Sequence, residues 1–257
     1  MMSRVACVLV LALVGCGDDG GGSGTGDDAG GSGSDDAAVT GDGPPPQECG
    51  TLHAVIRDFK IDHPDFEVVP AEPAGIVPGI VVATITPGGK PTLSPTAPAN
   101  DLVQDATTFA QWYTDVPGTN MKFEQDFTLT ETPPGSGTFV YDNAAYFPID
   151  GEGFGNEGNA HNFHFTTELH ASFIYKGGEE FSFRGDDDVW VFVNGKQVID
   201  IGGVHGPLEQ SVNFDARAAE LGITVGNTYA IDFFQAERHV TGSNFKLTTS
   251  IACFVIL

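Results

Sequence analysis

The chain has 257 residues and carries 35 acidic side chains against 11 basic ones, a formal net charge of −24 at pH 7. Such an excess of negative charge repels phosphate backbones and anionic lipid surfaces, so nucleic acid is not an expected partner. Residues 47–257 supply aromatic and aliphatic side chains throughout, enough for one large core.

The first 15 residues predict a lipoprotein signal peptide. Arg4 precedes an apolar stretch, 5–14, that is too short for a membrane span and is typical of a secretory signal. The letters LVGC at 13–16 resemble the bacterial lipobox, in which the Cys is lipidated and becomes the mature N-terminus. We therefore expect Cys16 to anchor the protein in the cell envelope, at the outer membrane or the cell surface. An ordinary cleaved signal is the alternative.

Residues 16–46 predict a flexible tether. Gly, Ser and Asp dominate this stretch, and it lacks aromatic side chains, so it cannot bury enough surface to offset chain entropy. The predicted domain follows at 47–257, with Cys49 and Cys253 near its two ends. In an oxidising compartment these two could form a disulfide, and two buried free thiols are the alternative.

The domain itself predicts an antiparallel all-β sandwich with long loops and at most one or two short helices. The best helix signal is 215–223, with an Asp cap, an Ala-rich turn and a Gly stop. Elsewhere short apolar or alternating runs are separated by Gly, Pro and Asn, as in sandwiches. These runs are 51–59, 79–85, 122–132, 137–143, 162–177, 181–185, 189–201, 228–238 and 244–256.

One hairpin frames an unusual acidic run. Asn194 and Gly195 form a two-residue turn signal, so 189–193 should pair with 196–201. Three consecutive carboxylates, Asp186, Asp187 and Asp188, then stand at the start of the first strand. Adjacent like charges repel and a buried carboxylate needs a partner, so a positive group is expected beside them.

Three separated motifs carry a family resemblance. The segments FSFRGDDDVWVFVNGKQVIDIGGVH, YFPIDGEGFGNEGNAHNFHFTTELH and FFQAERHVTGSNFKL resemble the fibro-slime domain, and the likeness extends over nearly all of the chain after about Leu52. That family is close to the PA14-like domains of adhesins, toxins and glycosidases, which are β-sandwiches. In calcium-dependent lectins of this wider group, two consecutive Asp joined by a cis peptide hold a Ca²⁺ that also contacts sugar hydroxyls.

The resemblance implies a Ca²⁺ site in this chain. The Asp pair falls on Asp186 and Asp187, while Asp188 stands where the pattern has Gly, which leaves open which two bind. Asn244 would complete the site. Ca²⁺ takes about six to eight oxygen ligands, and adjacent strand residues point to opposite faces unless the backbone departs from the strand. A solvated acidic loop without an ion is the alternative.

Two further sets of residues have competing interpretations. Three histidines, His161, His164 and His170, suggest a metal cluster near Glu168, but strand alternation separates them, so hydrogen-bonded or packed histidines are favoured over zinc. Among the aromatic residues, Trp112, Tyr113 and Tyr146 are either a sugar-stacking platform or part of the core.

The sequence therefore predicts a lipid-anchored, surface-exposed, calcium-binding module for carbohydrate or extracellular-matrix adhesion. No nucleophile elbow, HExxH motif or phosphate loop is visible, so we do not expect an enzyme. One alternative is a polysaccharide-acting hydrolase with Glu152 and Asp186 as acid and base, which would need facing carboxylates. Another is a self-assembling structural protein of a matrix.

Overall fold

The computed structural model of the chain describes residues 47–67, 75–98 and 103–255. The signal peptide, the tether and Cys16 lie outside these residues, so those expectations stay predictions. Within the same ranges no helix has the length and apolar character needed to cross a membrane.

The described chain folds into two antiparallel sheets, which confirms the predicted fold class. The larger sheet has the strand order β1-β13-β6-β11-β8-β9, with β2 joining β6 to β3. It consists of β1 (Gln47–Cys49), β2 (Thr51–Phe59), β3 (Asn120–Thr128), β6 (Phe165–Ile174), β8 (Asp188–Val193), β9 (Lys196–Ile201), β11 (Thr228–Glu237) and β13 (Cys253–Val255). The smaller sheet, in the order β10-β7-β12-β5-β4, consists of β4 (Thr130–Glu131), β5 (Phe139–Asn143), β7 (Glu180–Gly185), β10 (Leu208–Asn213) and β12 (Phe245–Thr249).

The main core lies between the two sheets. Alternate residues of a strand point to opposite faces, so Ile231 and Phe233 of β11 enter this core while Phe234 points the other way. Phe183 of β7 and Phe245 of β12 meet Phe233 from the smaller sheet, with ring centroids 5.0 Å and 5.3 Å away. The sandwich is therefore closed by aromatic contacts from both sheets.

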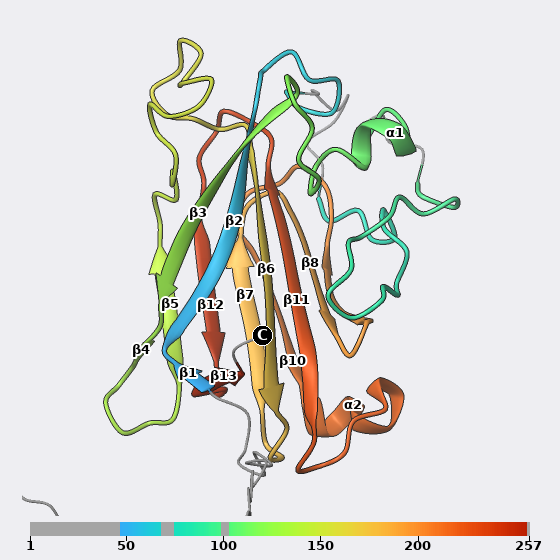
Figure 1. Cartoon of the computed structure of the whole chain (residues 1–257), viewed down its shortest axis with the longest axis vertical. Helices are drawn as coiled ribbons and strands as arrows, with labels where there is room; N and C mark the ends of the chain where they lie inside the picture. Colours follow the sequence, from blue (N-terminus) through green and yellow to red (C-terminus); the bar gives the residue numbers. More distant parts are fainter. Residues whose placement is uncertain (1–46, 68–74, 99–102, 256–257) are drawn as a thin grey trace, which may run out of the picture. The chain divides into compact units, whose positions relative to one another are not determined.

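A second apolar cluster covers the outer face of the larger sheet. Long loops between β2 and β3, together with the short helix α1 (Ala106–Phe109), lie beside β8 (Figure 1). Trp112 packs against Trp190 of β8, with ring centroids 6.2 Å apart, and Phe109 meets the same Trp190 at 5.8 Å. This face of the sheet is consequently buried, which explains why β8 reads as a continuous apolar run.

Local turn and cap signals decide two further elements. The predicted hairpin is present: β8 pairs with β9, and both Asn194 (φ 49°) and Gly195 (φ 73°) adopt left-handed backbone conformations. Helix α2 (Phe214–Leu221) also forms, but its N-cap is Asn213, whose side chain accepts the Ala216 N–H at 3.0 Å. The expected Asp cap was therefore placed two residues too late.

Candidate functional site

The candidate site lies where the chain crosses from the smaller sheet to the larger one. Strand β7 ends at Gly185 and β8 begins at Asp188, so the three aspartates span the crossing. A Cβ at Gly185 would lie 2.4 Å from the Asn244 carbonyl oxygen, so only glycine permits this close approach. Asp186, Asp187 and Asp188 are 4%, 2% and 0% exposed, which rules out the solvated acidic loop.

Asp188 has a protein cation as its partner. The Arg238 guanidinium donates from Nε to Oδ2 at 2.6 Å, and the Gly203 N–H donates to Oδ1 at 2.7 Å. The guanidinium also lies 4.9 Å from the centroid of the Trp112 ring. The arginine therefore satisfies part of the expectation of a nearby positive group, with a charge-assisted hydrogen bond on the outer face of the larger sheet.

Asp187 points between the sheets and is held by backbone donors. Its Oδ1 accepts the His205 N–H at 3.1 Å, and its Oδ2 accepts the Arg238 N–H at 2.9 Å. Burial raises the pKa of Asp187, and the Arg238 charge opposes that rise. The carboxylate is thus fixed in place by the loop after β9 and by the residue following β11.

Asp186 is brought to Asn244, as the predicted site requires. The Asn244 Nδ2 donates to Asp186 Oδ2 at 2.7 Å, and the Asp186 N–H donates to the Asn244 carbonyl at 3.3 Å. Burial raises the pKa of Asp186 to about 6. One expectation is wrong: the one cis bond within the described ranges is Thr132–Pro133, so the peptide joining Asp186 to Asp187 is trans.

Glu237 is not among the residues that the sequence predicted for the site. It is the last residue of β11, it is 1% exposed, and its carboxyl group contacts the Ser243 hydroxyl and the Asp187 carboxyl group. Burial raises its pKa well above the ordinary value, and the neighbouring charge of Asp187 adds to the rise. Strand alternation did contain a signal, since Glu237 shares a face with the core residue Phe233.

Two buried oxygen atoms at this junction, Asp186 Oδ1 and Gln235 Oε1, lack a hydrogen-bond partner among the described residues. The Glu237 carboxyl group and the Ser243 hydroxyl contact each other close to Asp186 and Asp187. Buried polar atoms are normally hydrogen-bonded, so a group of unpartnered oxygens calls for an explanation. An all-oxygen set fits a hard cation such as Ca²⁺ better than zinc, which prefers nitrogen and sulfur.

The acidic groups alone do not make a conventional metal cluster. Across the part of the chain that is described, no three His, Cys, Asp or Glu side chains are arranged to hold one metal ion. A cation at the junction would therefore depend on neutral oxygens from amide, hydroxyl or backbone groups beside at most two carboxylates. Ca²⁺ commonly accepts such mixed sets.

The histidines do not converge, in agreement with the hydrogen-bonded alternative. His161 contacts Asp150 at 2.6 Å, and His164 contacts Glu67 at 3.0 Å. His170 lies elsewhere, on the outer face of β6.

The His170 network is a structural ion cluster. Burial, the largest single effect, lowers the pKa of His170, but hydrogen bonds to Asp232 (2.6 Å) and Glu168 (2.7 Å) outweigh it and raise the pKa to about 9. Burial likewise raises the pKa of Glu168, yet hydrogen bonds from His170 and Lys90 and the nearby charge of Arg57 lower it to about 2. The network is thus charged at neutral pH.

The expected aromatic platform is absent from the surface. Trp112 and Tyr146 are both 0% exposed. Trp112 donates its Nε1–H to Asp65 Oδ2 at 2.9 Å, and the Tyr146 hydroxyl bonds to Thr167 Oγ1 at 2.9 Å. These residues belong to the core, the alternative that the sequence left open, so the interpretation as ligand-binding residues is wrong.

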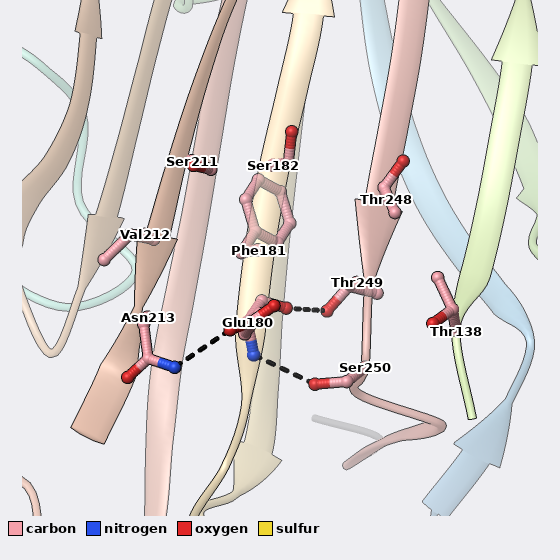
Figure 2. A pocket seen from close by; sticks show the side chains of 10 residues that line it. All are labelled: Thr138, Glu180, Phe181, Ser182, Ser211, Val212, Asn213, Thr248, Thr249 and Ser250. Atoms are coloured by element: carbon pink, nitrogen blue, oxygen red, sulfur yellow. Dashed lines mark hydrogen bonds between the residues drawn. The ribbon is translucent and has the colours of Figure 1, made fainter. Parts of the chain in front are cut away.

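A polar cavity of about 170 Å³ lies on the outer face of the smaller sheet (Figure 2). Its polar groups bond to one another: Asn213 Nδ2 donates to Glu180 Oε1 at 3.0 Å, and the Glu180 N–H donates to Ser250 Oγ at 2.9 Å. Glu180 begins β7, so the cavity lies at the opposite end of that strand from Asp186. We assign no ligand to it, because its carboxylate and amide already satisfy each other.

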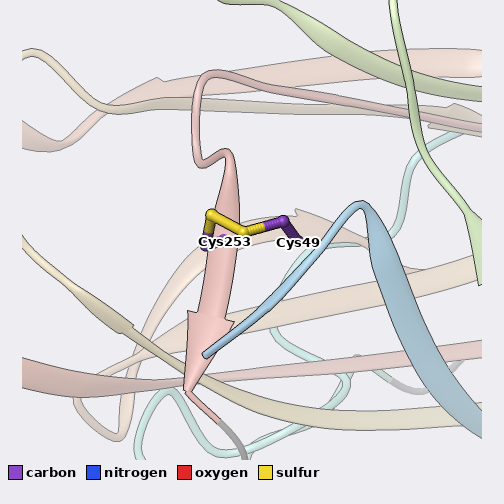
Figure 3. The surroundings of a disulfide bond; sticks show 2 residues. All are labelled: Cys49 and Cys253. Atoms are coloured by element: carbon purple, nitrogen blue, oxygen red, sulfur yellow. A yellow bond between two sulfur atoms is a disulfide. The ribbon is translucent and has the colours of Figure 1, made fainter. Parts of the chain in front are cut away.

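The terminal strands are joined by a disulfide between Cys49 and Cys253, the first of the two possibilities that the sequence left open (Figure 3). Cys49 of β1 lies directly opposite Cys253 of β13, with their Cα atoms 4.0 Å apart. The bond therefore ties the beginning of the sandwich to its end.

Comparison with known families decides the identity of this fold. Residues 115–253, more than half of the chain, match the PA14 domain. The chain belongs to the PA14 domain family. The match includes the aspartate crossing, Glu237 and Asn244, whereas β2 and most of the covering loops precede the matched part of this PA14 protein.

Several relatives are proteins of Dictyostelium discoideum. Protein psiQ is 39% identical over 214 residues, which cover 78% of this chain and 21% of that protein. Protein psiD is 40% identical over 213 residues, which cover 78% of this chain and 41% of that protein. The PA14 chain thus spans between about a fifth and two fifths of the length of these relatives.

Solved structures resemble the chain only distantly. The PA14 domain of the MpAFP antifreeze protein has 12% identity and a TM-score of 0.28, covering 43% of this chain and 63% of that one. The PA14 sugar-binding domain from an RTX adhesin has 13% identity and a TM-score of 0.29, covering 44% and 68%. These likenesses carry no information on the ligand of this chain.

Proposed function

We propose that this PA14 domain is a calcium-binding module for carbohydrate or extracellular-matrix adhesion. One observation carries the proposal: Asp186 keeps a buried oxygen without a hydrogen-bond partner close to the carboxyl groups of Asp187 and Glu237, at the end of the sandwich where the chain crosses between the sheets. The ligand site would lie at this end, around Asp186, Asp187 and Asn244. These are the positions that the resemblance to calcium-dependent lectins marks.

The contacts favour Asp186 and Asp187 over Asp188 as the ion-binding pair. Asp188 already has the Arg238 guanidinium, whereas Asp186 keeps one buried oxygen without a partner. A bound Ca²⁺ would supply positive charge to the remaining carboxylates. The protein residues would hold the crossing in one conformation, with Asn244 fixing Asp186 through its amide.

We further propose that the domain belongs to the fibro-slime group and is attached to the cell envelope through lipidated Cys16. The lipobox-like LVGC and the Gly-rich stretch after it support this proposal. Metabolic labelling with a radioactive fatty acid tests it, because label should enter the wild-type protein and not Cys16→Ser. Equal labelling of both proteins would exclude this anchor.

No catalytic role is assigned to the domain. Asp186 is buried and hydrogen-bonded to Asn244, whereas Glu152 is exposed on a loop. Neither residue therefore has the setting of an acid–base pair facing a polysaccharide. A binding module is the simpler account of the same carboxylates.

Glycan binding by the full chain tests the adhesion proposal. The fluorescently labelled protein would be applied to an array of polysaccharides with Ca²⁺ and then with EDTA. We expect Ca²⁺-dependent binding that Asp186→Asn loses and that Asp62→Asn, a change at an exposed aspartate, retains. Absence of binding to every polysaccharide with Ca²⁺ present would reject carbohydrate adhesion, and self-association of the protein would then indicate a structural matrix role.

A further inference from the structure

His164, the residue before β6, lies buried between two glutamates from different parts of the chain. Its Nε2 contacts Glu67 Oε1 at 3.0 Å, and its Nδ1 faces Glu157 Oε2 at 3.5 Å. The His164 side chain is 3% exposed. Glu67 belongs to the connection after β2, and Glu157 belongs to the connection between β5 and β6. One imidazole ring therefore joins two separate connections.

Both glutamates adopt an unusual backbone conformation. Among the non-glycine residues that the structure describes, those with positive φ are Glu67 (53°), Glu157 (47°) and Asn194. Asn194 belongs to the β8–β9 turn, so the other two are the two partners of His164. A left-handed conformation is unfavourable for a residue with a Cβ and persists where the surroundings compensate it. The contacts of the two carboxylates supply that compensation.

The same two carboxylates also bind backbone groups. Glu67 Oε1 accepts the Val240 N–H at 2.9 Å, and Glu157 Oε2 accepts the Ile61 N–H at 2.6 Å. Val240 lies in the connection between β11 and β12, which ends at Asn244. Three connections are thus held together by two carboxylates around one histidine.

We propose that His164 is a pH-sensitive switch that holds these connections together when its ring is charged and releases Glu157 when its ring is neutral. An imidazolium donates from both nitrogens, whereas a neutral imidazole donates from one. The Nε2 contact with Glu67 has the length of a hydrogen bond, so the neutral ring keeps its proton there. Its Nδ1 lone pair then faces the Glu157 carboxylate, and two acceptors repel each other. Histidine ordinarily changes charge between pH 5 and 8, and the switch acts in that range.

Two further titratable groups lie near the His164 ring. His239 Nε2 lies 3.8 Å from Glu67 Oε2, on the side away from the ring contact. Asp58 is buried close enough for its charge and that of His164 to act on each other, and burial raises the pKa of Asp58 to about 6. The Asp58 carboxyl group accepts the Phe154 N–H instead of contacting the ring. Asp58 therefore ionises in the same pH range, and the test has to separate it from His164.

The test uses the full chain between pH 5 and 8, with the ring nitrogens of His164 followed by ¹⁵N NMR and the backbone amides by hydrogen exchange. We expect both ring nitrogens to carry protons at the acidic end and Nε2 alone at the basic end. Protection of the Ile61 amide, corrected for the intrinsic effect of pH on exchange, should fall about tenfold over this range. Protection of the Val240 amide should change by less than about twofold, because the contact between His164 and Glu67 remains.

Two variants separate the switch from other titrations. Glu157→Gln keeps an oxygen acceptor for the Ile61 N–H without a charge, and His164→Gln removes the titrating ring. In both, protection of the Ile61 amide should no longer depend on pH. His161→Gln is the matched control, because His161 lies in the same connection and contacts a different carboxylate, and it should keep the wild-type profile.

The inference fails on either of two results. A His164 ring that stays charged, or stays neutral, over the whole pH range would overturn it. Persistence of the pH dependence in Glu157→Gln or His164→Gln would assign that dependence to Asp58 and would also overturn it. Neither Ca²⁺ nor a glycan enters these measurements, so the switch is tested independently of the adhesion proposal.

Discussion

Removing the disulfide between Cys49 and Cys253 should destabilise the sandwich strongly. The two residues are separated by 204 positions, so the bond closes almost the whole folded chain into a loop. In the chain-entropy model a loop of this length lowers the entropy of the unfolded state by an amount worth about 5 kcal/mol at 25 °C. That figure is an upper value, because residual structure in the unfolded chain reduces it.

Equilibrium unfolding in urea, with the wild type oxidised and compared with Cys49→Ser/Cys253→Ser, measures this effect. We expect the free energy of unfolding to fall by about 3–5 kcal/mol and the dependence on urea to steepen, because an uncrosslinked chain exposes more surface. Reduction of the wild type should give the same shift. A loss below about 1 kcal/mol would refute the reasoning, since the terminal strands would then separate without affecting global unfolding.

Three other changes have defined outcomes. Asp188→Ala leaves the Arg238 guanidinium buried without this carboxylate and should cost about 3–5 kcal/mol in urea unfolding, whereas a cost below about 1 kcal/mol would show that the pair contributes little. His170 binds its proton more tightly in the folded state, so its contribution is full below pH 6.5 and is lost as the pH rises through about 9. The free energy of unfolding, measured by chemical denaturation, should fall by about 3 kcal/mol over this pH range. In His170→Gln the free energy of unfolding should depend less on pH over the same range. Gly153→Ala places a Cβ 2.1 Å from Asp58 Oδ2 at a φ of +57°, so it should lose about 1–3 kcal/mol of stability from the left-handed backbone and more from the close contact. Gly151→Ala, at a φ of +75° with open space around its Cβ, should lose only the backbone contribution, so Gly153→Ala should have the lower Tm.

Local patterns in the sequence were sufficient for the fold class and for several elements. The Asn194–Gly195 turn set the register of β8 and β9, because few other dipeptides adopt left-handed conformations at both positions. Helix α2 was found from its Ala-rich composition, while its cap was misplaced since Asn213 and Asp215 are both good caps and only the fold chooses between them. The covering loops that bury Trp112 could not be foreseen, because no periodicity links them to the sheet.

The site was predicted in part. The motif placed Asp186 beside Asn244 correctly, and that contact joins residues 58 positions apart. Glu237 lies outside the motif that marked the site, and it differs from Arg238 because neighbouring residues of a strand point to opposite faces. The partner of Arg238 is consequently Asp188 on the adjacent strand, and Glu237 is left between the sheets.

The three aspartates differ in role because the chain crosses from the smaller sheet to the larger one at these residues. Asp188 is already part of β8 and points outward to a guanidinium, Asp187 points between the sheets to backbone donors, and Asp186 remains in the crossing with one oxygen free. Arg238 places its guanidinium on the outer face, so the carboxyl groups of Asp186, Asp187 and Glu237 lie at the same end of the sandwich without that cation between them, and burial raises the pKa of each. This arrangement results from the crossing itself, since a regular strand would have turned alternate carboxylates to solvent or to Arg238. The Ca²⁺ proposed at Asp186 and Asp187 would favour their ionised forms and would thereby stabilise the crossing.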